Sequence, residues 1–393
     1  MKSILEYGAV GDGVTNCSYA ICEALKNEKE IFFPKGVYSI EETIYIPSDR
    51  HIKLDDEAVI FAADGCFKGE DAIGIITNAD VENGNENIVI EGGKVDANNI
   101  NNARLDWLHG PNSGLTFAFK KVKNLTIRNL ISHNSESFNF RLCRVEDFLI
   151  EDITFSASHI SKNQDGVHIS GWCKNGVIKN IKAEYGTTND DLIAMNADET
   201  DVGEKQLKGI ESGPISDIYI ENVYAQNCWS AVRIVSIFNS VENITVKNLT
   251  AGVRAHAINM DATRYCETPI FKDEEYPKGV GSIKNINFEN ITFWYMGKEW
   301  EEEILTGKKK VPFTYDAFNL PEKVMIPLEI NGDITIKNLA RDLSKDTNPE
   351  VTFVGLKHLH DVKAEINGEE VDLDGKDFII NAEKIDLKIT KSR

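Results

Sequence analysis

Short segments of alternating apolar and polar residues recur along the chain, and each opens on Asn or Asp. The clearest copies begin at residues 87, 124, 147, 175, 217, 243, 285 and 333, as in NLTIRNL at 124 and DIYIENV at 217. Many contain a second Asn or Asp before another aliphatic residue. Alternation with a period of two over a short run predicts a β-strand. We therefore expect a strand at every copy.

The spacing of the copies predicts how these strands are arranged. Successive starts lie 23 to 48 residues apart, and the shortest steps match one coil of a parallel β-helix, with inserted loops in the longer ones. A helical solenoid needs apolar residues at i, i+3 and i+4, which these segments lack. An antiparallel sandwich is the alternative, but it does not account for the returning Asn. Coils of a β-helix stack ~4.8 Å apart, so that each Asn can hydrogen-bond its counterpart on the next coil.

The two ends of the chain differ from the repeated middle. Residues 1–60 contain a Gly-rich segment, YGAVGDGVTN, then CSYAICEALKN, predicted as a short helix N-capped by Asn16, and then two or three strands. We interpret the helix as a cap on the open end of the coil stack. Residues 61–300 form the repeated coils, and residues 301–393 are predicted as divergent final coils and C-terminal strands. The prediction is one β-helix domain over residues 1–393.

The charge balance narrows the class of partner. Asp and Glu number 63 against 43 Lys and Arg, which gives a formal net charge of −20. Phosphate repulsion therefore argues against nucleic acid and against an anionic membrane as partners. An acidic saccharide is still compatible, because a local basic pocket can act within an acidic field. No sequence feature predicts an oligomeric state, so this property is left unknown.

The cysteines and the first residues bear on the expected compartment. Seven scattered cysteines without C-x-x-C spacing predict reduced thiols, most of them small core residues. The start MKSILEYGAV has no apolar segment typical of a signal peptide, and no stretch approaches ~18 uninterrupted apolar residues. A cytoplasmic location is therefore expected for the chain as written. A chain already trimmed of its signal peptide would be secreted.

Three carboxylates occupy matching positions on two adjacent predicted coils. Counted from the repeat starts at 147 and 175, Asp165 lies 18 residues along its coil, while Asp190 and Asp191 lie 15 and 16 along the next. Their side chains are thus expected within ~5–10 Å of one another. Two carboxylates this close disfavour each other's charge, so one pKa should rise. A protonated carboxyl beside an ionised one is the pair that glycoside hydrolysis requires.

The same counting brings polar side chains of neighbouring coils to the carboxylates. Cations and imidazoles fall at similar offsets, and two tryptophans close to the acidic positions can stack on the apolar face of a sugar. The predicted substrate-binding residues are Arg141, His168, Arg233, His256, Trp172 and Trp229. Trp107 is expected to pack in the core instead. The alternative to a shared site is a set of unrelated acidic turns on the surface.

Two parts of the sequence resemble known families. YGAVGDGVTN, AICEAL and EIFFPKGVYSI resemble the opening of proteins of the pectin lyase-like superfamily, which are right-handed parallel β-helices. Residues 163–199 are similar to the core of the polygalacturonase-like family 28 glycoside hydrolases, where an N-x-D-G segment and a later D-D pair supply the catalytic carboxylates. The resemblance covers roughly residues 5–295. It implies an all-β fold, a single-stranded right-handed parallel β-helix, and hydrolysis of a pectin-like or other poly- or oligosaccharide.

The resemblance also implies roles for the three carboxylates. Asp190 corresponds to the general acid, and Asp165 and Asp191 to the pair that holds the attacking water, with inversion at the anomeric carbon and neither metal nor cofactor.

Two departures from the family pattern bear on substrate binding. No G-H-G segment follows the Asp pair, and Val235 stands where the family has a carboxylate-binding Lys. His168 is a candidate for part of the missing histidine's role. Arg141, Lys162, Arg233 and Arg254 can still pair with a sugar acid.

Two other functions fit the same sequence. Asp165, Asn189 and the Asp pair are hard oxygen ligands, so a calcium-dependent polysaccharide lyase on the same β-helix is one alternative. A non-catalytic glycan-binding β-helix is the other. If the chain is cytoplasmic, an imported oligosaccharide and exo action are expected, with the loops at about 97–115, 198–216 and 262–282 closing one end of the cleft.

Overall fold

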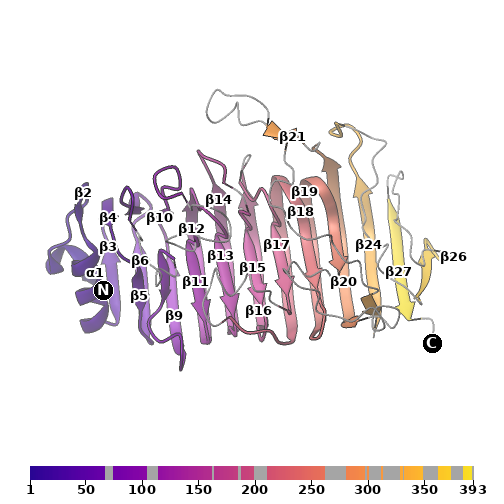
Figure 1. Ribbon diagram of the computed structural model, residues 1–393, viewed down its shortest axis with the longest axis horizontal. Coiled ribbons are helices and arrows are strands. Elements are labelled where there is room, and N and C mark those ends of the chain that lie inside the picture. Colours follow the sequence, from indigo (N-terminus) through magenta and orange to yellow (C-terminus); the bar gives the residue numbers. More distant parts are fainter. Residues whose placement is uncertain are drawn as a thin grey trace.

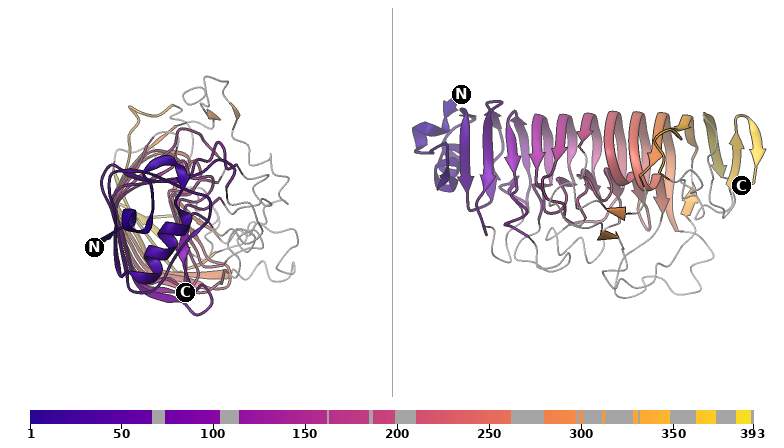
Figure 2. Two further views of the ribbon diagram at one scale, coloured as in Figure 1. Left: turned by 90° about the vertical axis from the view of Figure 1, so that its left-hand side faces the viewer. Right: turned by 90° about the horizontal axis from the view of Figure 1, so that it is seen from above.

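The computed structural model has the shape of a long stack of coils, with α1 at one end and β27 at the other (Figure 1). It describes residues 1–66, 74–103, 114–161, 163–184, 187–198, 210–261, 280–296, 299–300, 311–312, 328–330, 332–347, 362–372 and 384–391. Seen along the long axis, successive coils superimpose around a common interior, as a β-helix requires (Figure 2).

The strands pair in parallel and in sequence order, so that each runs beside its counterpart one coil later. Three such ladders run the length of the coils. The first contains β1 (Lys2–Ser3), β3 (Glu30–Phe33), β6 (Arg50–Leu54), β9 (Asn85–Glu91) and the opening parts of β12 (Val122–His133), β14 (Glu146–Ser156), β16 (Lys174–Ala183), β18 (Ile215–Val235), β19 (Ser240–Asp261), β20 (Val280–Tyr295) and β24 (Ile334–Arg341).

The other two ladders complete each coil. The second contains β2 (Asp12–Asn16), β4 (Gly36–Ile40), β7 (Ala58–Ala62), β10 (Lys94–Asp96) and later parts of the long strands. The third contains β5 (Ile44–Ile46), β8 (Ile76–Asn78), β11 (Phe117–Lys120), β13 (Phe140–Cys143), β15 (Val167–Ser170), β17 (Ile193–Asn196) and the ends of β18 and β19. β23 (Leu328–Ile330) pairs with β20, and β21 (Glu299–Trp300) pairs with β22 (Val311–Pro312).

Alternation along each strand sends every second side chain into the interior, where equal positions of successive coils stack. Ile127, Ile150 and Ile178 follow one another in register and are buried. The rings of Phe117 and Phe140 stack in the same way, with centroids 4.7 Å apart. The core is therefore a set of apolar columns that continue from coil to coil.

The recurring Asn residues form two amide ladders on the outside of the coils. The repeat-start positions, such as Asn87 and Asn124, have a positive φ, and Asn124 Nδ2 donates to Asn87 Oδ1 at 2.9 Å. The second Asn of each repeat behaves alike: Asn248 Nδ2 donates to Asn222 Oδ1 at 3.2 Å and Asn290 Nδ2 to Asn248 Oδ1 at 3.0 Å. Asn tolerates the left-handed conformation better than other residues with a side chain. The expectation that Asn bonds its counterpart is thus confirmed.

Replacing Asn248 by Ala should destabilise the fold by roughly 2–3 kcal/mol, because Ala resists the left-handed conformation and cannot bond either neighbour. Urea unfolding measures the loss. Asn248→Gly keeps the backbone conformation at φ 54° and loses only the side-chain bonds, so it should cost less. Equal losses in the two variants would contradict the conformational part of the argument.

Two helices cover the N-terminal end of the stack (Figure 1). Helix α1 (Ser18–Asn27) buries Ala20, Ile21, Ala24 and Leu25, and the short 3-10 helix η1 (Ile4–Tyr7) packs beside it. The N-cap lies one residue beyond the predicted position: Cys17 holds it, while Asn16 Oδ1 accepts a hydrogen bond from the Ser18 amide at 2.9 Å.

Local features of the first and last strands refine the sequence expectations. Between residues 30 and 62 the structure has five strands, not two or three. At the other end, β25 (Val362–Ile366), β26 (Glu369–Val371) and β27 (Ile385–Lys391) pair antiparallel, and β27 closes the first ladder on β24.

Six cysteines lie in the described residues and all are free thiols, five of them buried; Cys266 lies outside that part. No helix among the described residues is long and apolar enough to cross a membrane.

Candidate active site

The third ladder lines up the predicted polar residues on the outer face of the coils. Its register pairs Arg141 with His168, His168 with Ala194, Ala194 with Arg233, and Arg233 with Asn259. The residues between them in each strand are core residues such as Val167 and Ile169. Alternation therefore turns this row away from the core, and one row carries two guanidinium groups and an imidazole.

The three carboxylates stand one turn before these strands. Asp165 precedes β15, and Asp190 and Asp191 precede β17. The backbone holds them in register, since the Gly166 amide donates to the Asp191 carbonyl at 3.0 Å. All three side chains are almost fully buried, with exposed fractions of 2% for Asp165, 4% for Asp190 and 3% for Asp191. We call these three residues the acidic cluster.

Asp165 is held by the coil before it and by its own strand. His168 Nδ1 lies 2.7 Å from Asp165 Oδ2. The imidazole stacks on the Phe138 ring with centroids 4.4 Å apart, and the Arg141 guanidinium carbon lies 5.1 Å from the centroid of the same ring. The side-chain amide of Asn139 donates to the Asp165 carbonyl at 2.9 Å. These contacts fix the Asp165–His168 pair rigidly.

The Asp pair has different partners. Asn163 Nδ2 donates to Asp190 Oδ2 at 3.1 Å, and Arg233 Nη1 lies 3.6 Å from Asp191 Oδ2. The loops are tied together by Gln164, whose amide donates to Asn189 Oδ1 at 3.0 Å.

The inner carboxylate oxygens, Oδ1 of Asp165 and of Asp191, are buried and accept no hydrogen bond from the described residues. In the described part of the chain, two buried acceptors are thus open to a further donor.

Burial and mutual repulsion raise the pKa of two of the three carboxyls. Burial raises the pKa of Asp165 to about 6, the Asp190 charge adds to the rise, and the bond from His168 opposes it. Burial also raises the pKa of Asp191 well above its usual value, followed by repulsion from Asp190 and opposed by Arg233. The rise expected from the sequence is present, and desolvation is its main cause.

Two further predicted residues lie beside the acidic cluster. The Trp229 amide donates to the Asp190 carbonyl at 2.8 Å, and the side chain is half-buried. His256 pairs in register with Ser230, whose carbonyl accepts from the Leu192 amide next to Asp191.

Trp172 is not brought to the cluster. Trp172 follows β15, whereas Asp165 precedes it, so the two residues lie at opposite ends of that strand. Trp107 and Lys162 lie outside the described residues, as do most of the three long loops.

The sequence pattern alone does not single out some contributors. Phe138 positions His168 and Arg141 by stacking, but it lies two residues before the core residue Phe140, where β13 begins, so that alternation gives the two rings the same expected side. Asn163 reads in the sequence only as a polar neighbour of Asp165, although its side chain bonds Asp190 on the next coil. The coil register is the signal that indicates this contact.

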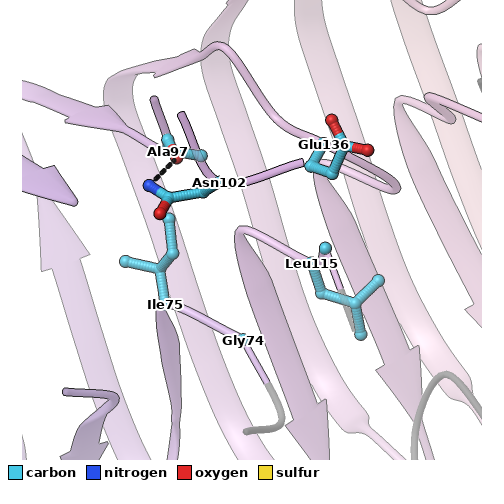
Figure 3. A pocket seen from close by; sticks show the side chains of 7 residues that line it. Gly74, Ile75, Ala97, Asn102, Leu115 and Glu136 are labelled. Atoms are coloured by element: carbon cyan, nitrogen blue, oxygen red, sulfur yellow. Dashed lines mark hydrogen bonds between the residues drawn. The ribbon is translucent and has the colours of Figure 1, made fainter. Parts of the chain in front are cut away.

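A small cavity lies on the N-terminal side of the cluster, lined by Asn102, Leu115 and Glu136 among others (Figure 3). Asn102 Nδ2 donates to the Ala97 carbonyl at 3.3 Å across one wall. Its volume of about 20 Å³ suffices for a water molecule and not for a sugar. In the described part of the chain, no three His, Cys, Asp or Glu side chains converge as a metal-binding group.

Relatives of known name were found by sequence. An exopolygalacturonase of Platanus acerifolia is 25% identical over 330 residues, which is 75% of this chain and 83% of that protein. Plasmin and fibronectin-binding protein A of Streptococcus pneumoniae is 26% identical over 186 residues, 43% of this chain, and the match spans about a quarter (26%) of that relative's own length.

A solved structure has the same fold. The family 28 exopolygalacturonase of Yersinia enterocolitica matches with a TM-score of 0.51 at 16% identity, covering 75% of this chain and 66% of that one. This likeness confirms the right-handed parallel β-helix predicted from the sequence. The model of glycosyl hydrolases family 28 matches residues 54–320, the part of the chain that holds the acidic cluster and the row of the third ladder. The chain therefore belongs to glycosyl hydrolases family 28.

Proposed function

We propose that the protein hydrolyses glycosidic bonds of a pectin-like, acidic poly- or oligosaccharide with inversion, and that it removes sugars from the chain end. The observation that carries this proposal is the acidic cluster: three buried carboxyls on adjoining coils, two of them with a raised pKa. The named exopolygalacturonase relatives support exo action and an acidic substrate.

In this mechanism Asp190 protonates the leaving oxygen, and Asp165 and Asp191 hold the attacking water on the other side of the sugar ring. The two open Oδ1 atoms suit that water, because each accepts no hydrogen bond from the described chain. A carboxylate whose pKa is about 6 is a stronger base than an ordinary Asp. Burial, followed by repulsion from Asp190, raises the pKa of Asp191, so this carboxyl keeps a proton to a higher pH than an ordinary Asp does.

Guanidinium groups of the third ladder would bind the sugar acid. Arg141 and Arg233 flank His168 in one row, and Arg254 is buried one coil further along. Arg binds carboxylates through two parallel hydrogen bonds, which suits the planar acid group of a uronate. Val235 is buried and cannot replace the family's Lys, so these arginines carry recognition of the acid group.

The proposal predicts a pH profile that depends on His168. The rate requires an ionised Asp165, so kcat/KM should rise as the pH passes about 6. Since His168 lowers the pKa of Asp165, His168→Asn should shift this acid limb to higher pH, apart from any loss of overall rate. His133→Asn, a matched change on the second ladder, should leave the limb in place. An unmoved limb in His168→Asn would contradict the assignment of Asp165 as base.

Product analysis tests the function directly. Purified protein is incubated with polygalacturonate and with defined galacturonate oligomers, with and without EDTA, and products are resolved by chromatography and by NMR of the new anomeric centre. We expect saturated monomer first, inverted at the anomeric carbon and unaffected by EDTA.

Other products would decide against parts of the proposal. Unsaturated products that disappear with EDTA would indicate the calcium-dependent lyase, and binding without any cleavage would indicate a glycan-binding β-helix. Mid-chain cleavage of the polymer as the first event would exclude exo action.

A further inference from the structure

A second groove lies at the far end of the third-ladder strands from the acidic cluster. It has a volume of about 460 Å³, and its walls include Lys121, Lys123, Arg144, Trp172, Lys174 and Ser216, which we call the tryptophan groove. Trp172 lies seven positions after Asp165 along an extended strand, which is roughly 20 Å. The groove is therefore separate from the candidate active site.

One wall of the groove is a row of turn residues on three successive coils. Lys121, Arg144 and Trp172 each follow a third-ladder strand and each have a left-handed backbone, with φ of 56°, 53° and 67°. Their amides donate to the next coil in the same manner, Lys121 to Cys143 at 2.9 Å and Arg144 to Gly171 at 3.0 Å. The side chains therefore project side by side, about one coil spacing apart.

A tryptophan is an unusual occupant of this position. A bulky side chain in the left-handed region costs roughly 1–2 kcal/mol, whereas Asn fills the equivalent conformation at many other turns of this protein. The indole is nonetheless 45% exposed. Burial in the core thus does not account for this residue, and a binding role does.

The other wall is a row of polar residues in register, three of them charged. Lys123, Glu146, Lys174 and Ser216 follow one another along the first ladder. Lys174 pairs with Glu146 at 3.3 Å, and Lys121 and Arg144 both contact Glu211. Lys123 is exposed and makes no ion pair with the described residues. Four cations and two carboxylates, Glu146 and Glu242, therefore line one groove of a chain whose net charge is −20. Glu242 is paired with Lys284 at 3.5 Å, so the cations still outnumber the carboxylates that face a ligand.

Aromatic and cationic groups are combined here in the way that suits a charged sugar. The Arg144 guanidinium carbon lies 5.6 Å from the centroid of the Trp172 ring, so the cation and the ring present one continuous surface. A pyranose face can pack on the exposed part of the indole, and a carboxylate or sulfate on a neighbouring sugar can reach Lys123.

We propose that the tryptophan groove is a second, non-catalytic binding site for an anionic saccharide chain. It lets the protein hold one stretch of such a chain while the acidic cluster is free or occupied by a chain end. This inference does not rest on catalysis at the acidic cluster, because binding in the groove needs neither Asp165 nor Asp190.

The experiment observes Trp172 directly. The protein is produced with 5-fluorotryptophan in an Asp190→Asn background, so that the probe, tri-galacturonate, is not consumed. The resonance missing from Trp172→Asn identifies Trp172, and Asn is chosen because it tolerates the left-handed turn. Titration with tri-galacturonate should shift this resonance saturably.

Matched variants and probes make the outcome decisive. Lys123→Glu should weaken the titration at Trp172 by about tenfold or more, whereas Tyr224→Ala, an exposed aromatic on another ladder, should leave it unchanged. A sulfated carrageenan trisaccharide distinguishes general anion binding from selection of carboxylates. A Trp172 resonance that stays still, or that shifts equally with neutral maltotriose, overturns the proposal. Cleavage assays on the parent protein decide the proposed hydrolase separately.

Discussion

Replacing Asp190 by Asn should remove nearly all turnover, and so should replacing Asp165 by Asn. General acid or base catalysis by one positioned group contributes about 10²–10⁴-fold, so each variant should lose on the order of 10³-fold in kcat. In Asp190→Asn the new amide has no acidic proton for the leaving oxygen, and in Asp165→Asn the new amide cannot take a proton from water. Initial rates on a galacturonate oligomer measure both losses, with circular dichroism to verify the fold.

The matched control for both variants is Asp152→Asn. Asp152 lies on the amide ladder outside the site, where it accepts a hydrogen bond from Asn180 Nδ2 at 2.8 Å. Other coils already carry Asn at this position, so the control should keep full activity. Substantial turnover in both Asp165→Asn and Asp190→Asn would refute the assignment of the acidic cluster as catalytic.

Asp165→Asn should also make the protein more stable above pH 6. The folded pKa of about 6 exceeds the ordinary value of 3.8, so burying the ionised carboxylate costs stability. Below about pH 4 the carboxyl is protonated in the folded and the unfolded protein, and the free energy of unfolding is not reduced. As the pH rises through about 6, ionisation of Asp165 lowers the free energy of unfolding by roughly 3 kcal/mol. Asn has no charge to bury. The gain over the parent should therefore be small at pH 4 and about 2–3 kcal/mol at pH 8.

Urea unfolding at pH 4 and pH 8 measures this difference in the free energy of unfolding. Asp191→Asn should behave in the same direction, because burial raises its pKa too. Asp152→Asn serves again as control and should show no pH-dependent gain. A gain for Asp165→Asn that is equal at both pH values, or larger at pH 4, would contradict the desolvation argument.

The repetition along the chain explains how much the sequence could predict. A fixed coil means that counting from Asn or Asp at a repeat start locates a residue in space, so the sequence alone suffices to align Asp165 with Asp191. Strand existence follows from alternation for the same reason. Arg141, His168 and Arg233 are likewise predicted on one strip, and the register of the third ladder brings them into one row.

Counting residues along the chain does not predict which end of a strand a residue near the site will occupy. Trp172 is close to Asp165 in sequence, but an intervening strand separates their side chains by its whole length. The role of Phe138 could not be predicted for another reason. A phenylalanine that supports a site and one that fills the core have the same pattern of apolar and polar neighbours in the sequence. Such distinctions depend on tertiary packing, which alternation does not encode.

The side-chain hydrogen bonds of the amide ladders all run in the same direction along the stack, and this direction divides the ladders into segments. Each Asn donates to the coil before it and accepts from the coil after it, but an ionised Asp can only accept. Asp147 accepts from Asn175 at 3.1 Å, and Asp152 accepts from Asn180, yet neither can donate back to the coil that starts at 124. Neither ladder therefore has a bond across the boundary between the coil of Phe138 and the coil of Asp165, and the first ladder alone is interrupted again at Asp217, which accepts from Asn243 at 3.0 Å. Hydrogen exchange should be fastest across this seam, and the seam runs through the candidate active site.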